Sequence, residues 1–220
     1  MSRTLAIGDI HGCATALETL VDFVGVTPED TLVCLGDYVD RGQQTREVIE
    51  FLLALREKCH LVTLRGNHEI MMEGARRARG EASQWLAVGG HAVLDSYRAS
   101  NLDDIPAEHW DFLRACVPSY ENETHFFVHA NADPDRALAD QSDAMLYWHH
   151  LDAPPPRHRS GKTMICGHTA QHNGRPLDLG HAVCIDTFAH GPGGWLTCLE
   201  PETGAYWQAN QSGERRIAKL

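Results

Sequence analysis

Six side chains with oxygen or nitrogen donors follow short apolar runs along this chain. They are Asp9, His11, Asp37, Asn67, His129 and His168. Asp9 and His11 are separated by one residue, so their side chains can project to the same side of an extended segment. Asp37 has two carboxylate oxygens and can bridge two cations. Oxygen and nitrogen donors without a thiolate are typical of Mn, Fe or Zn sites, and not of a structural zinc site built from cysteines. The sequence therefore predicts a site for two divalent metal ions.

Such a site would support phosphoryl transfer to water. Two divalent cations about 3.5–4 Å apart can hold a phosphoryl oxygen and generate a hydroxide nucleophile from bound water at neutral pH. A lone Asp or His after a strand is more often a turn residue or a hydrogen-bonded surface group, so no single position decides the matter. The metal site is expected because five polar clusters occur in order, each directly after an apolar run.

The apolar runs predict the elements that must hold these side chains. Residues 5–7, 31–35 and 61–64 have the composition of short buried strands, and helical periodicity follows the first two of them. Apolar residues between Leu17 and Val24 share one helix face. Strands that alternate with helices at this spacing predict βαβ units with parallel strands. Ligands of open α/β sheets bind outside the carboxyl ends of the strands, where the polar clusters lie.

The remainder of the chain predicts a helical cover and further strands. Residues 70–118 have the pattern of helices, at 71–78, 82–97 and 106–116, that would cover the entrance to the site. Later apolar runs are expected to form strands, at 125–130, 163–169, 182–186, 195–201 and 205–209. The last two flank a predicted hairpin turn at 202–204. We expect one α/β domain over residues 1–220.

The composition is typical of a globular protein and narrows the classes of partner. Lys and Arg total 19 against 30 Asp and Glu, so the formal charge is −11, and we expect neither nucleic acid nor a membrane surface as a partner. Seven cysteines without paired spacing predict buried thiols in a reducing compartment. Charged residues come too early for a signal peptide, and no run approaches the roughly 18 apolar residues of a membrane helix. We expect a cytoplasmic protein.

Five motifs in this order resemble the signatures of the PPP metallophosphatases, within the calcineurin-like phosphoesterase superfamily. They are GDIHG (8–12), GDYVDRG (36–42), RGNHE (65–69), VHA (128–130) and GHT (167–169). In length and in the covering segment the chain is similar to the small bacterial and phage serine/threonine protein phosphatases of this group. The resemblance covers residues 4–188. It implies the calcineurin-like metallophosphatase sandwich, in which central β-sheets are flanked by helices and carry a dinuclear metal site at the strand ends.

The resemblance also implies how the metal ligands divide between the two ions. One ion would be held by Asp9, His11 and Asp37. The other would be held by Asp37, Asn67, His129 and His168. Both ions are expected to be Mn²⁺, with Fe or Zn as alternatives.

Four further residues acquire roles from the same resemblance. His68 would be the general acid that protonates the leaving oxygen, and Asp40 would orient it. Arg41 and Arg65 would bind the phosphate, because a planar guanidinium presents a fork of hydrogen-bond donors.

One position departs from the family pattern. The family usually places a third phosphate-binding arginine shortly after a tryptophan, in the segment that here reads YWHH (147–150). His150 stands where that arginine would fall and could donate to phosphate when protonated. The role could instead pass to Arg157 or Arg159, or His149 and His150 could be cover residues without a catalytic part.

The leading expectation is a metal-dependent phosphomonoesterase that hydrolyses phosphoserine and phosphothreonine in proteins by direct attack of metal-bound hydroxide. The rival enzyme is a dinucleoside polyphosphate hydrolase of the diadenosine tetraphosphatase kind, whose motifs resemble GDLVARG and GNHD, so that Asp40 and Glu69 favour the protein phosphatase. A broad-specificity phosphatase for small phosphomonoesters is a further alternative. A binding module that has lost catalysis should lack a ligand or the acid, and a histidine-rich storage protein should have clustered His tracts.

Overall fold

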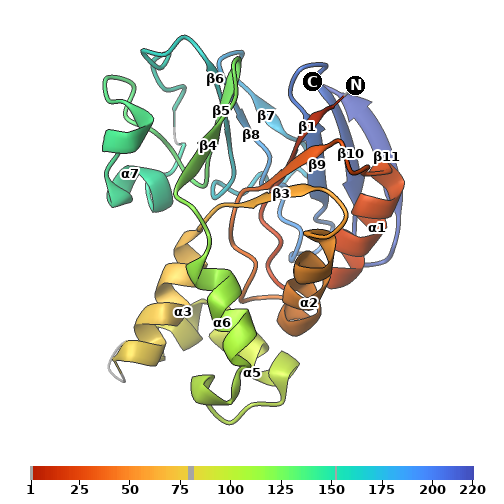
Figure 1. Ribbon diagram of the computed structural model, residues 1–220, viewed down its shortest axis with the longest axis vertical. Helices are drawn as coiled ribbons and strands as arrows, with labels where there is room; N and C mark the ends of the chain where they lie inside the picture. The colour runs from red at the N-terminus through yellow and green to blue at the C-terminus, as the bar shows by residue number, and fades with distance from the viewer. Residues whose placement is uncertain (1, 79–81, 152) are drawn as a thin grey trace.

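Two β-sheets pack face to face and contain most of the predicted apolar runs (Figure 1). The computed structural model describes residues 2–78, 82–151 and 153–220. The strands of the first sheet are β1 (Thr4–Ile7), β2 (Thr31–Cys34), β3 (His60–Thr63), β9 (Leu196–Glu200), β10 (Ala205–Ala209) and β11 (Arg215–Lys219). Their order across the sheet is β11-β10-β9-β1-β2-β3.

Parallel strands form one half of this sheet, and a meander forms the other. β1, β2 and β3 are parallel neighbours, and α1 (Ala14–Val24) and α2 (Thr45–Leu55) connect them in sequence. The predicted βαβ units are therefore confirmed. β9 and β10 form the predicted antiparallel hairpin, and β9 joins the sheet antiparallel to β1.

The second sheet has five strands and supplies the later of the predicted metal ligands. Its strands are β4 (Ser119–Glu121), β5 (His125–Val128), β6 (Thr163–Cys166), β7 (Leu177–Asp178) and β8 (Ala182–Cys184), in the order β4-β5-β6-β8-β7. β5, β6 and β8 are parallel, and β4 and β7 are antiparallel edges. The predicted strands are confirmed but end earlier than predicted, because the residues after them turn into the site. The edges β4 and β7, which the sequence pattern did not predict, have only three and two residues.

Three apolar clusters fill the spaces between the layers. The cluster between the sheets joins Val33 of the first sheet to Phe127 and Ile165 of the second. A second cluster packs α1 and α2 on the outer face of the six-stranded sheet, and a third packs α7 (Asp143–Tyr147) on the outer face of the other sheet. Because successive strand side chains point to opposite faces, β1 places Ala6 in the inner cluster and Leu5 in the outer one. The result is the α/β/β/α sandwich that the resemblance implies.

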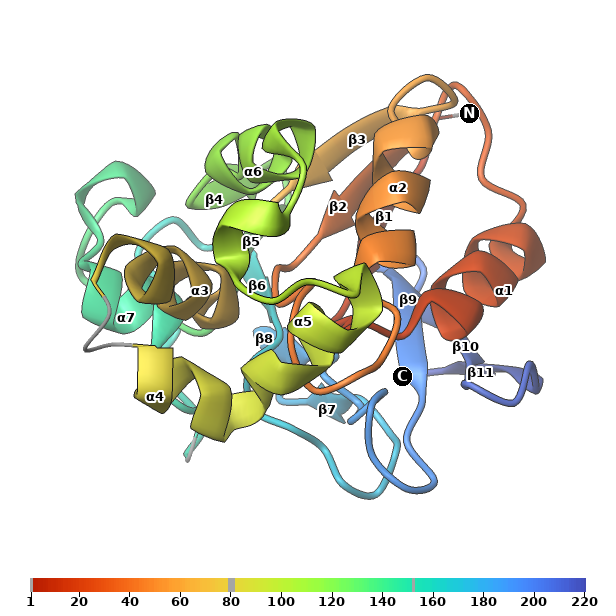
Figure 2. The ribbon, with the colours of Figure 1, turned by 90° about the horizontal axis from the view of Figure 1, so that it is seen from below.

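The helical cover lies below the sheets in Figure 1 and in front of them in Figure 2. Its elements are α3 (Asn67–Arg77), α4 (Ala82–Trp85), the π-helical turn η1 (Leu86–Gly90), α5 (His91–Tyr97), the 3₁₀ turn η2 (Leu102–Asp104) and α6 (Ala107–Arg114). Helices were predicted here; residues 79–81 lie outside the described part of the chain. The stretch 82–97, with the pattern of one helix, bends at Gly89, whose φ of 118° is readily accessible only to glycine.

The loops after the strands hold non-glycine residues in the left-handed region of φ and ψ. Seven such residues have positive φ within the described chain, and five of them belong to the predicted site. Those five are His11, Asp37, Asp40, Arg41 and His168. A non-glycine residue pays about 1–3 kcal/mol for this conformation, which persists only where the surrounding structure fixes it. The clustering of strained residues marks the strand ends as the place where geometry matters most.

The cysteines are buried thiols, as their unpaired spacing predicts. All seven cysteines are free and buried. Burial raises the pKa of Cys13 and Cys116 to about 12, so these thiols stay protonated at neutral pH and act as small apolar packing groups. Across residues 2–78, 82–151 and 153–220, no helix combines the length and the apolar character needed to cross a membrane.

Asp30 joins the beginnings of two neighbouring strands, β1 and β2. Its carboxylate accepts hydrogen bonds from the Arg3 guanidinium at 2.6 and 3.0 Å and from the Thr27 amide at 2.9 Å. The hydrogen bonds from Arg3, opposed by burial and assisted by Thr27, lower the pKa of Asp30 to about 2. The folded protein therefore favours the ionised carboxylate.

Replacement of Asp30 by Asn is expected to lower the free energy of unfolding at pH 7 by about 2 kcal/mol. A carboxylate with a depressed folded pKa stabilises the protein above its ordinary pKa of 3.8, and this contribution is lost as the pH falls through the folded value of about 2. Urea unfolding should therefore show a constant gap between wild type and Asp30→Asn above about pH 5 and a narrowing gap below about pH 4. A gap that stays unchanged in acid would contradict this account.

Candidate metal and catalytic site

The strand ends form a cleft of about 260 Å³ between the sheets and the cover. Five of the six predicted metal ligands line it, namely Asp9, His11, Asp37, Asn67 and His168. The sixth, His129, follows β5 and is fully buried beside Asp37 and Asn67. Loops after β1, β2, β3, β5 and β6 supply these residues. Residues that are up to 159 positions apart in the chain thus come together.

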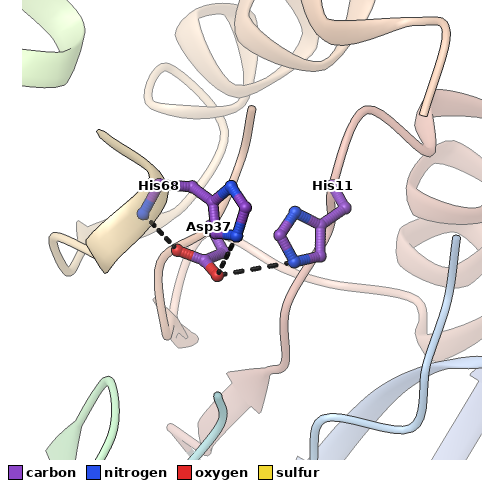
Figure 3. A group of neighbouring side chains, drawn as sticks. All are labelled: His11, Asp37 and His68. Atoms are coloured by element: carbon purple, nitrogen blue, oxygen red, sulfur yellow. Dashed lines mark hydrogen bonds and ion pairs between the residues drawn. The ribbon is translucent and has the colours of Figure 1, made fainter. Parts of the chain in front are cut away.

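Asp37 lies at the centre of the group. One of its oxygens, Oδ2, is 3.4 Å from His11 Nε2 and 3.9 Å from His68 Nε2 (Figure 3). The other oxygen, Oδ1, is 3.5 Å from His129 Nε2. Burial would raise the pKa of Asp37, but the three histidines outweigh it and hold the pKa below its ordinary value. The carboxylate is therefore ionised at neutral pH, with one oxygen toward His11 and the other toward His129.

The predicted histidine ligands are each fixed by a backbone carbonyl. His11 Nδ1 lies 2.9 Å from the Val39 oxygen, and His129 Nδ1 lies 2.9 Å from the Leu35 oxygen. His168 Nε2 lies 3.3 Å from the Trp148 oxygen. Because a carbonyl only accepts, each of these ring nitrogens carries the proton, and the other ring nitrogen keeps its lone pair. Such outer hydrogen bonds are typical of metal-binding histidines.

Burial keeps these imidazoles neutral. It lowers the pKa of His11 and His129, and it lowers the pKa of His168 to about 4. A neutral imidazole is the form that binds a metal ion.

Two imidazole nitrogens lie close to the Asn67 amide oxygen, and this group of acceptor atoms favours a bound cation. The amide oxygen of Asn67 lies 2.9 Å from His129 Nε2 and 3.2 Å from His168 Nδ1, and both nitrogens carry lone pairs by the argument above. Three acceptors without a hydrogen between them repel one another unless a positive charge lies among them. The groups His11–Asp37–His68 and Asp37–His129–His168 each bring their ligand atoms within 4.8 Å of one another. The donor set therefore fits divalent metal ions.

Further buried carboxylates strengthen this conclusion. The pKa of Asp9 is raised well above its ordinary value by burial, by Asp186 and by Asp37. The pKa of Asp186 is raised to about 6, mainly by burial. Buried acidic groups this close are costly without a compensating cation. The backbone amide of His168 donates to both Asp9 oxygens, at 3.0 and 3.1 Å, and so holds Asp9 at the cleft.

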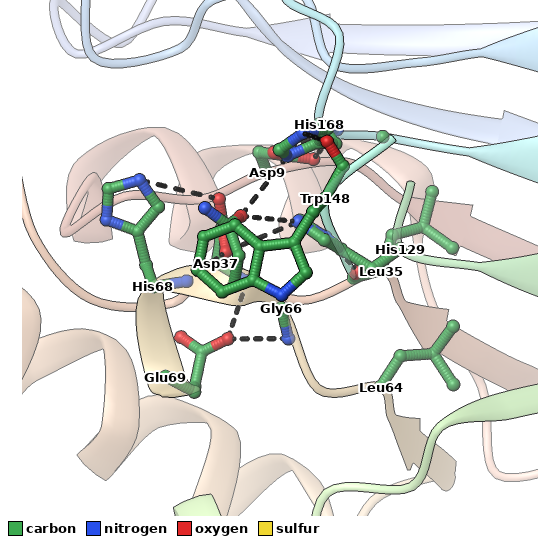
Figure 4. A network of polar contacts seen from close by, with 12 residues as sticks. Asp9, Leu35, Asp37, Leu64, Gly66, His68, Glu69, His129, Trp148 and His168 are labelled. Atoms are coloured by element: carbon green, nitrogen blue, oxygen red, sulfur yellow. Dashed lines mark hydrogen bonds and ion pairs between the residues drawn. The ribbon is translucent and has the colours of Figure 1, made fainter. Parts of the chain in front are cut away.

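Glu69 holds two of the motif loops together (Figure 4). Its carboxylate accepts hydrogen bonds from the amides of Asp37, Tyr38 and Gly66 at 2.8–2.9 Å. A side chain on Gly66 would place its Cβ 2.1 Å from Asp37 Oδ1, so the close approach requires glycine. Burial raises the pKa of Glu69 to about 7. The glutamate of RGNHE thus orients the backbone that carries Asp37.

His68 and Asp40 form a buried pair at the cleft. His68 Nδ1 is 2.6 Å from Asp40 Oδ2, and His68 Nε2 faces both Arg41 Nη2 at 3.2 Å and Asp37. Burial alone would lower the pKa of His68, but Asp37 and Asp40 raise it above its ordinary value. The pair has the geometry of a histidine whose distal nitrogen is aimed at the site by a carboxylate.

The predicted phosphate-binding residues do not all reach the cleft. Arg41 and His150 line it, and the His150 ring packs 4.5 Å from that of His168. The Arg65 guanidinium instead donates to the Arg114 carbonyl at 3.2 Å and lies 4.0 Å from Glu73, so this structure separates it from the cleft. Its phosphate-binding role stays a prediction, and substrate would have to draw it away from these partners.

Asp186 and His190 are titratable residues in or beside the cleft to which the sequence assigned no role. Asp186 lines the cleft two residues after β8, and the strand-end rule that selected the other ligands would have found it. The His190 ring lies 4.9 Å from that of His11, and its Nε2 is 3.4 Å from Arg41 Nη1. His190 belongs to a loop, and no local pattern in the sequence singles it out.

Comparisons with known proteins agree with this geometry. The chain matches the family model for calcineurin-like phosphoesterases over residues 2–191. It is 35% identical over 101 residues to the symmetrical bis(5'-nucleosyl)-tetraphosphatase of Pseudomonas syringae pv. syringae, covering 46% of this chain and 32% of the relative. It is 48% identical over 65 residues to a Caenorhabditis elegans protein named as a serine/threonine-protein phosphatase, covering 29% of this chain and 18% of the relative. This chain thus spans less than two thirds of either relative.

A solved structure shares the fold along nearly the whole chain. The crystal structure of a protein described as a diadenosine tetraphosphatase superposes with a TM-score of 0.69 at 19% identity, covering 99% of this chain and 93% of that one. The family match includes all six predicted metal ligands, and the family uses divalent metal ions, which agrees with the His and Asp groups in the cleft. The chain belongs to the calcineurin-like phosphoesterase family.

Proposed function

We propose that this protein is a metal-dependent phosphomonoesterase that hydrolyses phosphoserine and phosphothreonine in proteins. The observation that carries the proposal is the buried His68–Asp40 pair beside Asp37. A serine or threonine alkoxide leaves poorly unless it is protonated as the P–O bond breaks. Cleavage of a dinucleoside polyphosphate expels a phosphate group, which is a better leaving group and needs a proton donor far less. The pair therefore favours a phosphomonoester of an alcohol.

The residues of the cleft have different roles in this reaction: metal binding, phosphate binding and proton donation. The metal ligands would be Asp9, His11, Asp37, Asn67, His129 and His168. Bound divalent cations supply Lewis acidity and a nucleophile at neutral pH, and the thiolate-free donor set favours Mn²⁺. Arg41 binds phosphate oxygens from the cleft wall. His68, in the imidazolium form that Asp37 and Asp40 favour, donates its Nε2 proton to the leaving oxygen while Asp40 holds Nδ1.

A covalent route through cysteine does not fit this chain. Residues 59–65 (CHLVTLR) have the C-x₅-R spacing of cysteine phosphatases. The Cys59 thiol is buried and donates to the Leu55 carbonyl, and burial raises its pKa, whereas a nucleophilic cysteine needs a lowered one. We therefore propose direct displacement by water, without a phosphoenzyme.

A dinucleoside polyphosphate hydrolase is the second candidate. The 35% identity to a bis(5'-nucleosyl)-tetraphosphatase favours it. Asp40 argues against it. The corresponding motif of that group resembles GDLVARG, which lacks the aspartate that contacts His68 in this chain.

A side-by-side assay separates the two candidates. The manganese-loaded protein is given a phosphothreonine peptide, p-nitrophenyl phosphate and diadenosine tetraphosphate, and kcat/KM is measured for each. We expect the phosphothreonine peptide to be hydrolysed at least about tenfold faster than the dinucleotide, a difference of about 1.4 kcal/mol in the barrier. Faster cleavage of the dinucleotide by orders of magnitude would overturn the proposal in favour of the second candidate. A phosphotyrosine peptide of the same sequence tests the preference for serine and threonine.

A further inference from the structure

Trp85 joins the helical cover to the His68–Asp40 pair. Its indole Nε1 donates a hydrogen bond to Asp40 Oδ1 at 2.8 Å, while the other oxygen, Oδ2, lies 2.6 Å from His68 Nδ1. Trp85 is 2% exposed, and Asp40 is fully buried. Each oxygen of Asp40 therefore has its own partner, and the three side chains form one line of hydrogen bonds that ends at the cleft.

The same segment of the cover also holds the backbone next to Asp40. The Gly89 carbonyl accepts a hydrogen bond from the Arg41 amide at 3.2 Å. Asp40 and Arg41 both have a φ of 68°, in the left-handed region. A Cβ on Gly89 would lie 2.7 Å from the Arg41 nitrogen, so the two backbones are in close contact. Residues 85–90 thus contact both members of a strained dipeptide at the cleft.

We propose that Trp85 is a positioning residue for phosphoester hydrolysis, which fixes Asp40 so that Asp40 aims His68 at the leaving oxygen. The inference rests on the role of His68 in the proposed function. Without the indole N–H, one oxygen of a fully buried carboxylate loses its hydrogen-bond partner, which is energetically unfavourable. The carboxylate can recover that energy only by turning toward another donor or by taking up a proton. Either change weakens its hold on His68.

Trp110 provides a matched control on the same cover. It lies in α6 and is 1% exposed, so it is buried to the same degree as Trp85. Within the part of the chain that the structure describes, its indole Nε1 has no hydrogen-bond partner. Replacement by Phe removes a similar volume from both positions, but only at position 85 does it remove a hydrogen bond.

The test compares phosphate esters with poor and good leaving groups. We expect Trp85→Phe to lower kcat for phenyl phosphate by about 10- to 100-fold, part of the roughly 10²–10⁴-fold that a positioned general acid contributes. For 2,4-dinitrophenyl phosphate, whose phenolate leaves without a proton, we expect a change of less than about threefold. In a His68→Asn background, Trp85→Phe should have almost no further effect, because the two residues act as one unit. Trp110→Phe should leave the ratio between the two substrates unchanged.

Each failure has a different meaning. If Trp85→Phe slows both esters equally, or neither, while His68→Asn slows mainly phenyl phosphate, the inference on Trp85 is overturned and the role of His68 stands. If His68→Asn itself shows no dependence on the leaving group, the proposed proton donor is wrong, and the inference falls with it.

A second measurement needs neither activity nor metal. In the ¹H–¹⁵N spectrum of the metal-free protein, the Trp85 indole proton should resonate at low field because it is bonded to a carboxylate. Asp40→Asn should move this resonance upfield and leave the Trp110 indole resonance in place. An unshifted Trp85 resonance would overturn the inference even if Trp85→Phe failed to fold.

Discussion

Asp37→Asn is expected to lower kcat/KM for phosphomonoesters by at least about 10³-fold and to reduce the bound divalent metal below two equivalents. Asp37 presents one oxygen to His11 and the other to His129, so it belongs to both groups of potential ligands. Asn has nearly the same shape but replaces an anionic oxygen with an N–H donor, which cannot bind a cation. We expect this change to remove several kcal/mol of transition-state stabilisation. Because each 1.36 kcal/mol corresponds to a tenfold change in rate, the decrease in kcat/KM should be large.

The measurement combines steady-state kinetics with metal content by elemental analysis after dialysis. Asp30→Asn is the matched control, since Asp30 is also buried and ionised but lies at the opposite ends of β1 and β2. It should keep its metal content and its activity at temperatures where it stays folded. Wild-type activity and metal content in Asp37→Asn would contradict the metal site described here.

The helices and parallel strands of the sandwich were predictable because their signals are local, whereas the pairing of two sheets followed only from the family resemblance. Periodic apolar residues mark α1 and α2, and short apolar runs mark the parallel strands of both sheets. The ligands followed from one rule, that polar residues directly after parallel strands meet at one edge of a sheet. Elements that escaped prediction lack such signals. β11 is an exposed polar edge strand, and α7 has only five residues and begins after the N-cap Ser142.

Contacts between distant segments could not be predicted from local pattern. Trp85 bonds to Asp40 across 45 residues, and the helical periodicity of 82–97 gives no indication of it. The bend at Gly89, by contrast, has a visible signal in the Gly89–Gly90 pair, which should have divided the predicted helix. Arg65 shows the limit of a motif: its position is implied by RGNHE, but its guanidinium is held by groups on α6 and α3.

His68→Asn is expected to lower kcat for a phosphothreonine peptide by about 10²- to 10⁴-fold and to change KM little. Asn cannot donate a proton to the leaving alkoxide. Arg41 and the proposed metal ligands remain in the cleft, where they would bind the phosphate. For 2,4-dinitrophenyl phosphate, which needs no proton, kcat should fall by less than about tenfold. His60→Asn is the control, since His60 is an exposed histidine at the beginning of β3, and it should match the wild type on both substrates.

Metal content decides what a different result would mean, because His68 also belongs to a group that could hold a metal ion. His68 Nε2 lies 3.9 Å from Asp37 Oδ2, and its ring centroid is 4.6 Å from that of His11. If His68 were a ligand, its replacement would lower metal content and slow both substrates alike. If it is the proton donor, the metal content stays at the wild-type value and only esters with poor leaving groups are slowed. The 2.6 Å contact from Nδ1 to Asp40 fits both roles, since a metal-binding histidine is held in the same way. The Arg41 guanidinium favours the second outcome, because its Nη2 lies 3.2 Å from His68 Nε2 and its positive charge opposes a metal ion at that nitrogen.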